Sequence, residues 1–223
     1  AWKFVEELKQ PRHSPRPWRR QQAQPGEISL AGGVEFVSGF ADPENLLETA
    51  YADFAAFLEA GSIPTGRGYR VETHHAPTPC YEAYRIEITA AGCRILAGDT
   101  EGIRRGIYFL EDEIARSGGP FLKLGTIERQ PKVKTRVSRC FFGPIKRPPK
   151  MRDELADDID YYPDNYLARL AYEGINGLWL TIEFKDLCRT DIAPEYGADR
   201  ERRLAKLRRT IARCRLYGIK IYL

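Results

Sequence analysis

The sequence predicts an α/β protein in which a small α+β domain is followed by the first strands and helices of a parallel (β/α) unit. Three observations support this prediction. In residues 26–130, some segments alternate apolar and polar residues as strands do, and others repeat apolar residues with the period of a helix. Residues 131–223 follow the order strand, helix, strand, helix, strand with short connections. Glycines stand where the helices should end. The 223 residues are 43% apolar and 30% charged, which excludes wholesale disorder.

The clearest helix of residues 26–130 begins at Asp42-Pro43, an N-cap residue followed by proline at the first helical position, and ends at Gly61. Apolar and charged side chains alternate over residues 84–88, which indicates a half-buried strand. The expected order is β-α-β-β-β-α-β, with strands near residues 28–37, 69–73, 84–88, 93–97 and 121–127 and helices over residues 43–60 and 100–116.

The order of the expected strands and helices changes after Pro131. Short joints between helix and strand, such as the one from Gly174 to Leu178, are typical of parallel strands with crossover helices. We expect strands over residues 135–142, 178–184 and 219–223, a long loop over residues 146–162, a helix between Pro163 and Gly174, and a helix over residues 199–217 that buries Leu204, Leu207, Ile211 and Cys214.

This second part predicts the start of a (β/α)8 TIM barrel. A closed barrel needs roughly 200 residues or more, far more than residues 131–223 supply. An open three-stranded sheet would leave a parallel edge and one face uncovered. We therefore expect a truncated barrel, completed by a longer polypeptide or by another chain.

Residues 1–25 carry the surplus charge. The first twenty residues hold six bases and two acids, a net charge of +4 that equals the net charge of the whole chain. Residues 21–223 are therefore neutral overall, and they give no electrostatic reason to bind nucleic acid. Prolines and arginines dominate residues 11–20 and predict a linker or an arm over the surface. The alternative is an anion-binding segment built from Trp18 and the arginines around it.

The five cysteines are odd in number and lack CxxC spacing, which argues against a disulfide framework and a structural zinc site. Reduced core cysteines favour a cytoplasmic protein. His74-His75 with Cys80 lacks the spacing of a metal site, and no glycine-rich phosphate loop occurs, so we expect no metal and no cofactor. No apolar run is long enough for a membrane span.

A resemblance to a known domain is visible in three segments. They are residues 82–88 (Glu-Ala-Tyr-Arg-Ile-Glu-Ile), 93–98 (Cys-Arg-Ile-Leu-Ala-Gly) and 102–110 (Gly-Ile-Arg-Arg-Gly-Ile-Tyr-Phe-Leu). This pattern resembles the accessory α/β domain that precedes the catalytic barrel in family-20 β-N-acetylhexosaminidases and related glycosidases, α-glucuronidases among them. The resemblance covers about residues 27–130.

Residues 137–143 (Val-Ser-Arg-Cys-Phe-Phe-Gly) resemble that family's first barrel strand, in which the arginine of Ser-Arg, here Arg139, holds the hydroxyls of the terminal sugar. Residues 176–181 stand where the family has Asn and a His-x-His strand. The chain departs from the pattern at Trp179 and Thr181 in place of the two histidines, and at Phe184 and Arg136 in place of two aspartates. The family's catalytic Asp-Glu pair follows the fourth barrel strand, beyond residue 223, so the resemblance assigns no catalytic residue.

Four residues are candidates for substrate binding: Arg139, Glu183, Trp179 and Arg136. Alternation predicts that Leu178, Leu180 and Ile182 face the helices and that Trp179, Thr181 and Glu183 face the barrel axis. Glu183 could accept hydrogen bonds from sugar hydroxyls or act as a catalytic carboxylate; the alternative is a buried acid paired with Arg139. Trp179 could stack on a sugar or fill the core.

The Arg139 guanidinium could hold two hydroxyls or a carboxylate, or form a structural ion pair across the barrel floor. Arg136 should point to the opposite face, so one of the two arginines would line the pocket. Asp186 and Arg189 are weaker candidates in a surface loop. The loop over residues 146–162 could form a pocket wall, with Asp157, Asp158 and Asp160 as a solvated acidic surface rather than a calcium loop.

The leading hypothesis is the N-terminal portion of a glycoside hydrolase that acts on terminal sugars of glycans or oligosaccharides, with β-N-acetylhexosaminidase-like activity as its specific form. Its partners would be a carbohydrate substrate and the remaining barrel segment, with neither nucleic acid nor membrane. The alternatives are a non-catalytic carbohydrate-binding or scaffold protein with a degenerate barrel, and an anion-binding module that uses the N-terminal arm.

Overall fold

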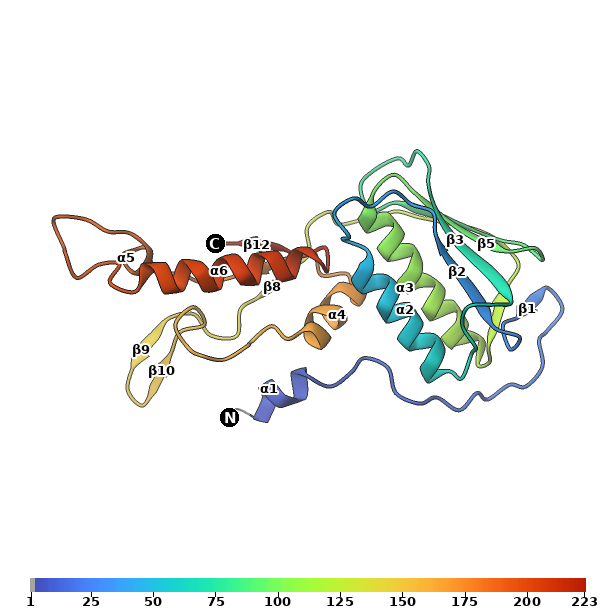
Figure 1. Cartoon of the computed structure of the whole chain (residues 1–223), viewed down its shortest axis with the longest axis horizontal. Helices are drawn as coiled ribbons and strands as arrows, with labels where there is room; N and C mark the ends of the chain where they lie inside the picture. Colours follow the sequence, from blue (N-terminus) through green and yellow to red (C-terminus); the bar gives the residue numbers. More distant parts are fainter. Residues whose placement is uncertain (1–2) are drawn as a thin grey trace. The chain divides into compact units, whose positions relative to one another are not determined.

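The computed structural model describes residues 3–223, with the backbone alone at Lys150 (Figure 1). The chain forms two compact units. We call residues 11–134 the N-terminal unit, and residues 3–10 together with residues 135–223 the C-terminal unit. The boundary at residue 134 lies four residues beyond the one expected from the sequence, and the predicted arm over residues 1–25 is divided between the two units.

The N-terminal unit is built on a five-stranded sheet with the order β2-β3-β5-β4-β7. Strands β2, β3 and β5 run parallel, whereas β4 is antiparallel to both β5 and β7. Helices α2 and α3 cover one face of this sheet (Figure 1). The elements are β2 (Val34–Ser38), α2 (Glu48–Ala60), β3 (Tyr69–His75), β4 (Tyr84–Ile88), β5 (Cys93–Ala97), α3 (Thr100–Ser117) and β7 (Gly125–Arg129).

Three elements differ from the sequence prediction. The strand expected near residues 28–37 is two strands, β1 (Glu27–Ser29) and β2, and the strand expected near residues 121–127 is likewise β6 (Phe121–Lys123) and β7. Strands β1 and β6 pair antiparallel in a separate two-stranded sheet. Helix α2 begins at Glu48 because Asp42 instead closes the turn before it, accepting a hydrogen bond from Leu47 N at 2.7 Å.

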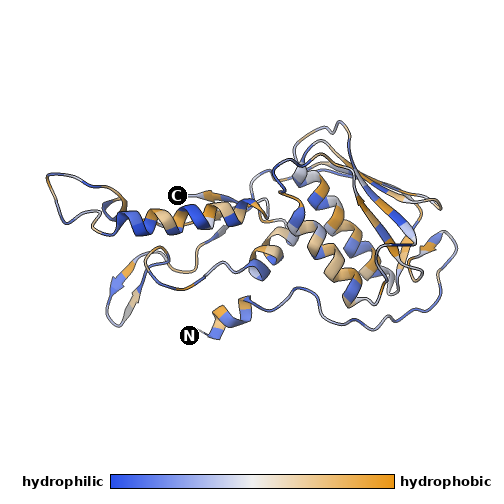
Figure 2. Ribbon diagram, viewed as in Figure 1, coloured by the Kyte–Doolittle hydropathy of each residue, from blue (hydrophilic) through white to orange (hydrophobic). Residues whose placement is uncertain are grey.

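The core lies between the two helices and the sheet. Figure 2 shows apolar stripes along both helices, and the seam of α3 follows the helical repeat. Gly102 and Gly106 let α3 approach the strands closely: a Cβ on Gly106 would collide with Ile95, and one on Gly102 with the Ala83 carbonyl. The buried members include Ala50, Phe54, Phe57, Leu58, Val71, Ile86, Ile95, Ile103, Ile107, Leu110 and Ile114.

A buried ion pair lies within helix α3. The Arg104 side chain is 0% exposed, and its Nε donates to Glu101 Oε2 at 3.1 Å. The same guanidinium donates to the Thr49 hydroxyl at 2.9 Å and to the Leu46 carbonyl. These bonds compensate the loss of hydration that burial of a charge entails.

The proline- and arginine-rich segment over residues 11–20 is docked on the N-terminal unit. Trp18 Nε1 donates to Gly61 O at 2.6 Å, and Arg16 N donates to Ala60 O at 2.8 Å, so both satisfy carbonyls at the C-terminal end of α2. Arg19 N and Arg20 N donate to Gly118 O, just beyond the end of α3. The segment therefore caps both helices and lies over the surface, as one of the two sequence interpretations expects.

The C-terminal unit contains three parallel strands in the order β12-β11-β8, which follow one another along the chain. Each strand spans three residues and is shorter than predicted. The elements are α1 (Lys3–Leu8), β8 (Val137–Arg139), β9 (Ile145–Arg147), β10 (Lys150–Arg152), α4 (Asp164–Tyr172), β11 (Gly177–Trp179), α5 (Phe184–Leu187), α6 (Arg200–Arg215) and β12 (Lys220–Tyr222).

Helices α4 and α6 form the two crossovers between these strands (Figure 1). Leu207 and Cys214 of α6 are buried as expected, but Ile211 is 41% exposed and Arg203 is buried instead. The prediction that Ile211 is buried is wrong, because no other described residue covers that part of α6. The visible surface of α6 is largely hydrophilic (Figure 2).

Helix α1 is held against an aromatic cluster of the C-terminal unit. The Phe4 ring lies 5.4 Å from the Phe141 ring and 6.0 Å from the Phe142 ring, measured between centroids. Arg169 Nη2 donates to Leu8 O at 2.6 Å, at the end of α1. None of the described helices combines the length and the apolar character that a membrane span requires.

Candidate functional site

The candidate site lies at the C-terminal edge of the three parallel strands. Arg139, Trp179 and Tyr222 are the last residues of β8, β11 and β12, and Trp179 is the register partner of both others. Register partners in a parallel sheet share a face, so these three side chains form one row. Arg139 Cζ lies 5.7 Å from the centroid of the Trp179 ring, within the range of a cation–π contact.

The row is open to solvent in the described residues. Trp179 is 50% exposed and Tyr222 is 41% exposed, whereas Leu178 and Leu180 are buried on the opposite face. The expected alternation along this segment is therefore present at residues 178–181. Trp179 is therefore half exposed among the described residues.

Glu183 follows β11 at the N-cap position of the short helix α5. Its Oε2 atom lies 2.8 Å from Lys185 Nζ and 3.2 Å from Lys146 Nζ. Hydrogen bonds from Lys185 and Lys146 hold the pKa of Glu183 below its usual range. Glu183 is thus an ionised carboxylate whose partners are lysines, in place of the Arg139 pairing that the sequence suggested.

Lys146 connects this carboxylate to a second one. Its Nζ donates to Asp186 Oδ1 at 2.8 Å and to Oδ2 at 2.7 Å, while Asp186 Oδ2 lies 4.0 Å from Arg203 Nη1. Arg203 in turn donates to Asp153. Burial lowers the pKa of Lys146, but hydrogen bonds from its ammonium to Asp186 and Glu183 outweigh burial and raise it.

Sequence reasoning named Glu183 and Asp186 but missed Lys146 and Arg203 as their partners. Lys146 stands on β9, 37 residues from Glu183 and 40 from Asp186, and no local spacing joins them. The hairpin of β9 and β10, inside the loop expected over residues 146–162, is therefore fastened to this edge. A cavity of about 10 Å³ lies beside Thr181, Glu183 and Asp186, which is room for about one water molecule.

Arg136 does not join the other candidates. It precedes β8 at the N-terminal end of the sheet, where its backbone N donates to Asn176 Oδ1 at 2.8 Å and its Nε donates to Gly174 O. These contacts fix the entry into β11. The structure thus brings Arg139, Trp179 and Glu183 to the C-terminal edge and places Arg136 at the other end.

The acidic loop residues make intramolecular contacts. Asp160 Oδ2 lies 2.7 Å from Arg213 Nη1, and Asp157 accepts from the Tyr161 hydroxyl at 2.8 Å. Sequence reasoning did not single out Glu154, which is buried and accepts hydrogen bonds from Phe142 N at 2.6 Å and from the Tyr162 hydroxyl at 2.7 Å. Glu154 therefore holds the segment after β8 in place.

The side chains at this edge offer three kinds of contact to a ligand. The Arg139 guanidinium offers several N–H donors, the Trp179 ring offers a flat apolar face, and the Glu183 carboxylate accepts hydrogen bonds. Because Glu183 is ionised and its pKa is lowered, it does not have a proton to donate near neutral pH. The edge is suited to binding polyhydroxylated molecules, and the described residues assign no general acid.

Comparisons with known proteins identify the fold. No family model and no curated protein matches the chain. A GH138 enzyme that targets pectin rhamnogalacturonan II matches 83% of this chain with a TM-score of 0.65 and 15% identity. CpGH84B matches 92% with a TM-score of 0.56 and 15% identity. The GH20 β-N-acetylhexosaminidase from Streptomyces coelicolor A3(2) matches 95% with a TM-score of 0.53 and 18% identity.

The chain spans 24%, 35% and 43% of the lengths of these three structures, respectively. At 15–18% identity, the likeness concerns the fold. The chain therefore has a mixed α/β fold that resembles domains of glycoside hydrolases.

Proposed function

We propose that the chain is the N-terminal portion of a glycoside hydrolase that acts on a terminal sugar of a glycan or an oligosaccharide. In this proposal the N-terminal unit is the accessory domain, and the C-terminal unit supplies the first three strands of a (β/α)8 barrel. The observation that carries it is the row of Arg139, Trp179 and Tyr222 at the C-terminal edge of consecutive parallel strands, the edge at which barrel enzymes bind their substrates.

The side chains of this edge fit a sugar. Trp179 offers its ring to the C–H face of a pyranose, and Arg139 donates hydrogen bonds to adjacent hydroxyls from beside that ring. Glu183, which is ionised, accepts a hydrogen bond from a hydroxyl. Hydrolysis usually requires two carboxyl groups, one of which carries a proton at the start. Glu183 does not fill that role, so we propose that the acid comes from a later barrel strand.

β-N-acetylhexosaminidase-like activity is the specific form of this proposal. The resemblance of residues 82–110 and 137–143 to family 20 supports it, as does the likeness in fold to a GH20 enzyme. In the family-20 mechanism the acetamido group of the substrate attacks the anomeric carbon while a glutamic acid protonates the leaving oxygen. A substrate with a 2-acetamido group should therefore be preferred over its 2-hydroxy counterpart.

The test is a panel of nitrophenyl glycosides incubated with the full-length protein, including N-acetylglucosaminide and glucoside as a matched pair. Turnover of at least one glycoside supports the proposal, and preference for the acetamido sugar supports its specific form. Arg208→Ala, an exposed substitution on the outer side of α6, is the control for Arg139→Ala. Absence of turnover with every glycoside, combined with sugar binding that depends on Trp179, would favour the second candidate.

That second candidate is a non-catalytic carbohydrate-binding or scaffold protein with a degenerate barrel. The observation that favours it is the pairing of both carboxylates at this edge: Glu183 with two lysines and Asp186 with Lys146. Such pairing suits a recognition surface, because ion-paired carboxylates are held ionised. Binding without turnover distinguishes it from the enzyme.

A further inference from the structure

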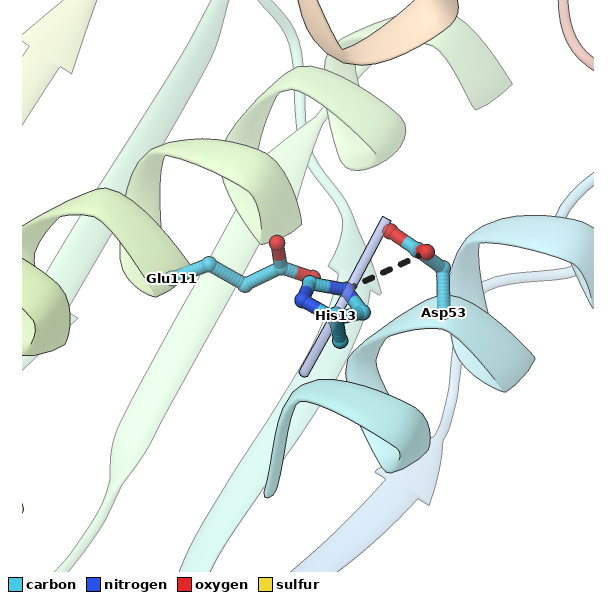
Figure 3. Close-up of side chains that lie close together, drawn as sticks. All are labelled: His13, Asp53 and Glu111. Carbon is cyan, nitrogen blue, oxygen red and sulfur yellow. Dashed lines mark ion pairs between the residues drawn. The ribbon is translucent and has the colours of Figure 1, made fainter. Parts of the chain in front are cut away.

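A group of three potential metal ligands lies in the N-terminal unit, away from the strand edge described above. His13 belongs to the docked proline- and arginine-rich segment, Asp53 to α2 and Glu111 to α3 (Figure 3). One ligand atom of each residue lies within 4.8 Å of the other two. Their side chains are 7%, 11% and 2% exposed, respectively, so the group is enclosed.

Two atoms of this group are left without a hydrogen bond among the described residues. They are Glu111 Oε1 and His13 Nε2, both fully buried. His13 Nε2 lies 3.2 Å from Asp53 Oδ1, close enough for an ion pair if the ring is charged, but not in the geometry of a hydrogen bond. Buried polar atoms normally have a partner, so the two orphaned atoms point to a ligand between these side chains.

The charges around His13, Asp53 and Glu111 also point to a ligand between these side chains. The Arg12 guanidinium contacts both Asp53 Oδ2 and Glu111 Oε2, so one positive charge faces two carboxyl groups. The two carboxyl groups thus share a single guanidinium. Glu111 therefore lacks a cationic partner of its own.

We propose that His13, Asp53 and Glu111 bind one divalent transition-metal ion, with Zn²⁺ as the best fit. Imidazole nitrogen with two carboxylate oxygens is a donor set that suits Zn²⁺, whereas Ca²⁺ and Mg²⁺ take oxygen ligands. Zinc–ligand distances of about 2.0–2.2 Å place tetrahedral ligand atoms about 3.4 Å apart. His13 Nε2 and Asp53 Oδ1 are already 3.2 Å apart, and the widest separation in the group, at most 4.8 Å, must close by at most about 1.4 Å.

Arg12 is compatible with this site. Its Nη2 donates to Asp53 Oδ2 and to Glu111 Oε2, and its Nε donates to Asp53 Oδ1 at 3.3 Å. Glu111 Oε1 and His13 Nε2 are left for the ion, and Asp53 Oδ1 would be shared between the ion and Arg12. The guanidinium then fixes the orientation of both carboxylates from outside, as hydrogen-bonding neighbours of metal ligands commonly do. Binding would join the N-terminal segment to two helices through a single ion.

The first test uses the intact chain and needs no substitution. The sequence contains three histidines, and His74 and His75 lie on β3 outside this group. After treatment with a chelator and dialysis, one equivalent of Zn²⁺ should shift the imidazole ¹⁵N resonances of His13 and leave those of His74 and His75 in place. Unchanged His13 resonances at saturating Zn²⁺ would overturn the proposal.

The second test measures Zn²⁺ affinity by calorimetry in Glu111→Gln and His13→Gln, with Glu113→Gln and His75→Gln as matched controls. Each cluster variant should lose affinity on the order of 100-fold or more, and the controls should bind one equivalent as the native chain does. Zn²⁺ at 100 times its Kd should also raise the thermal midpoint on the order of 10 °C in the native chain and in both controls, but not in the two cluster variants at that Zn²⁺ concentration. Equal affinity in all variants would contradict the proposed ligands.

Discussion

Arg139 and Trp179 end two neighbouring parallel strands in the same register, and the arginine Cζ lies 5.7 Å from the centroid of the indole ring. The contact orients a fork of N–H donors beside a flat apolar surface. A sugar needs both, because its hydroxyls are polar while one face of its ring is not. The pair is therefore the most informative place to test carbohydrate binding.

Arg139→Ala should lower kcat/KM, or sugar affinity if the protein is a binder, on the order of 10- to 100-fold. Hydrogen bonds to a charged donor contribute about 1.5–3 kcal/mol, which corresponds to that range. Because Arg139 is exposed, the free energy of unfolding should change by less than about 0.5 kcal/mol. Titration calorimetry and urea unfolding measure the two effects separately; a large loss of stability with unchanged binding would contradict the assigned role.

Lys146→Ala should raise the pKa of Glu183 toward its ordinary value of about 4.3, although Lys185 still opposes protonation. The lowered pKa means that the lysine contacts stabilise the folded chain above the unfolded-state pKa, and that this contribution disappears as the pH falls through the folded-state pKa. A ¹³C titration of the Glu183 carboxyl measures the shift. Lys123→Ala, in the N-terminal unit, should leave that titration unchanged.

Gly106→Ala should destabilise the N-terminal unit. The added methyl group would collide with Ile95, and overpacking of this kind costs about 1–3 kcal/mol, against a gain of about 1 kcal/mol in helix propensity. We expect a net loss of up to about 2 kcal/mol in urea unfolding. Gly32→Ala is the control, since nothing lies within 4 Å of its Cβ position. Equal stability of the two variants would show that α3 does not require this close approach.

Arg104→Met should cost about 3–5 kcal/mol, because it leaves the buried Glu101 carboxylate without its guanidinium partner. The double variant Arg104→Met with Glu101→Leu should recover most of that loss, since no buried charge then lacks a partner. Denaturant unfolding of both variants provides the measurement. A double variant as unstable as the single one would mean that the bonds from Arg104 to Thr49 and Leu46 carry the stability.

The periodicity of apolar residues predicted those parts of the fold that depend on neighbouring residues in the sequence. The seam of α3 and the alternation at Leu178 and Leu180 were predictable because burial there repeats with the period of the helix or strand. The break between β1 and β2 was not, because apolar residues continue on both sides of Gly32. Ile211 was misplaced because its periodicity fits the seam, while its exposure depends on which neighbours cover it.

The sequence likewise predicted the strand-end residues of the candidate site but not their distant partners. The positions of Arg139, Trp179 and Glu183 at the strand ends followed from the strand pattern and from the family resemblance. Lys146 did not, since it reaches Glu183 across 37 residues of sequence. The group of His13, Asp53 and Glu111 is a more extreme case. Arg12, the neighbour of His13 in sequence, is 99 residues from Glu111 and contacts it only when the N-terminal segment docks.

The division of the chain has a consequence for how the protein is made. Helix α1 belongs to the same compact unit as residues 135–223, but the whole N-terminal unit lies between them in sequence. A ribosome adds about 5–20 residues per second, so α1 leaves it on the order of ten seconds before its partners exist. The six-residue helix is too short to persist alone during that interval. The N-terminal unit can therefore fold first, and helix α1 reaches its place only after residues 135–223 have been synthesised.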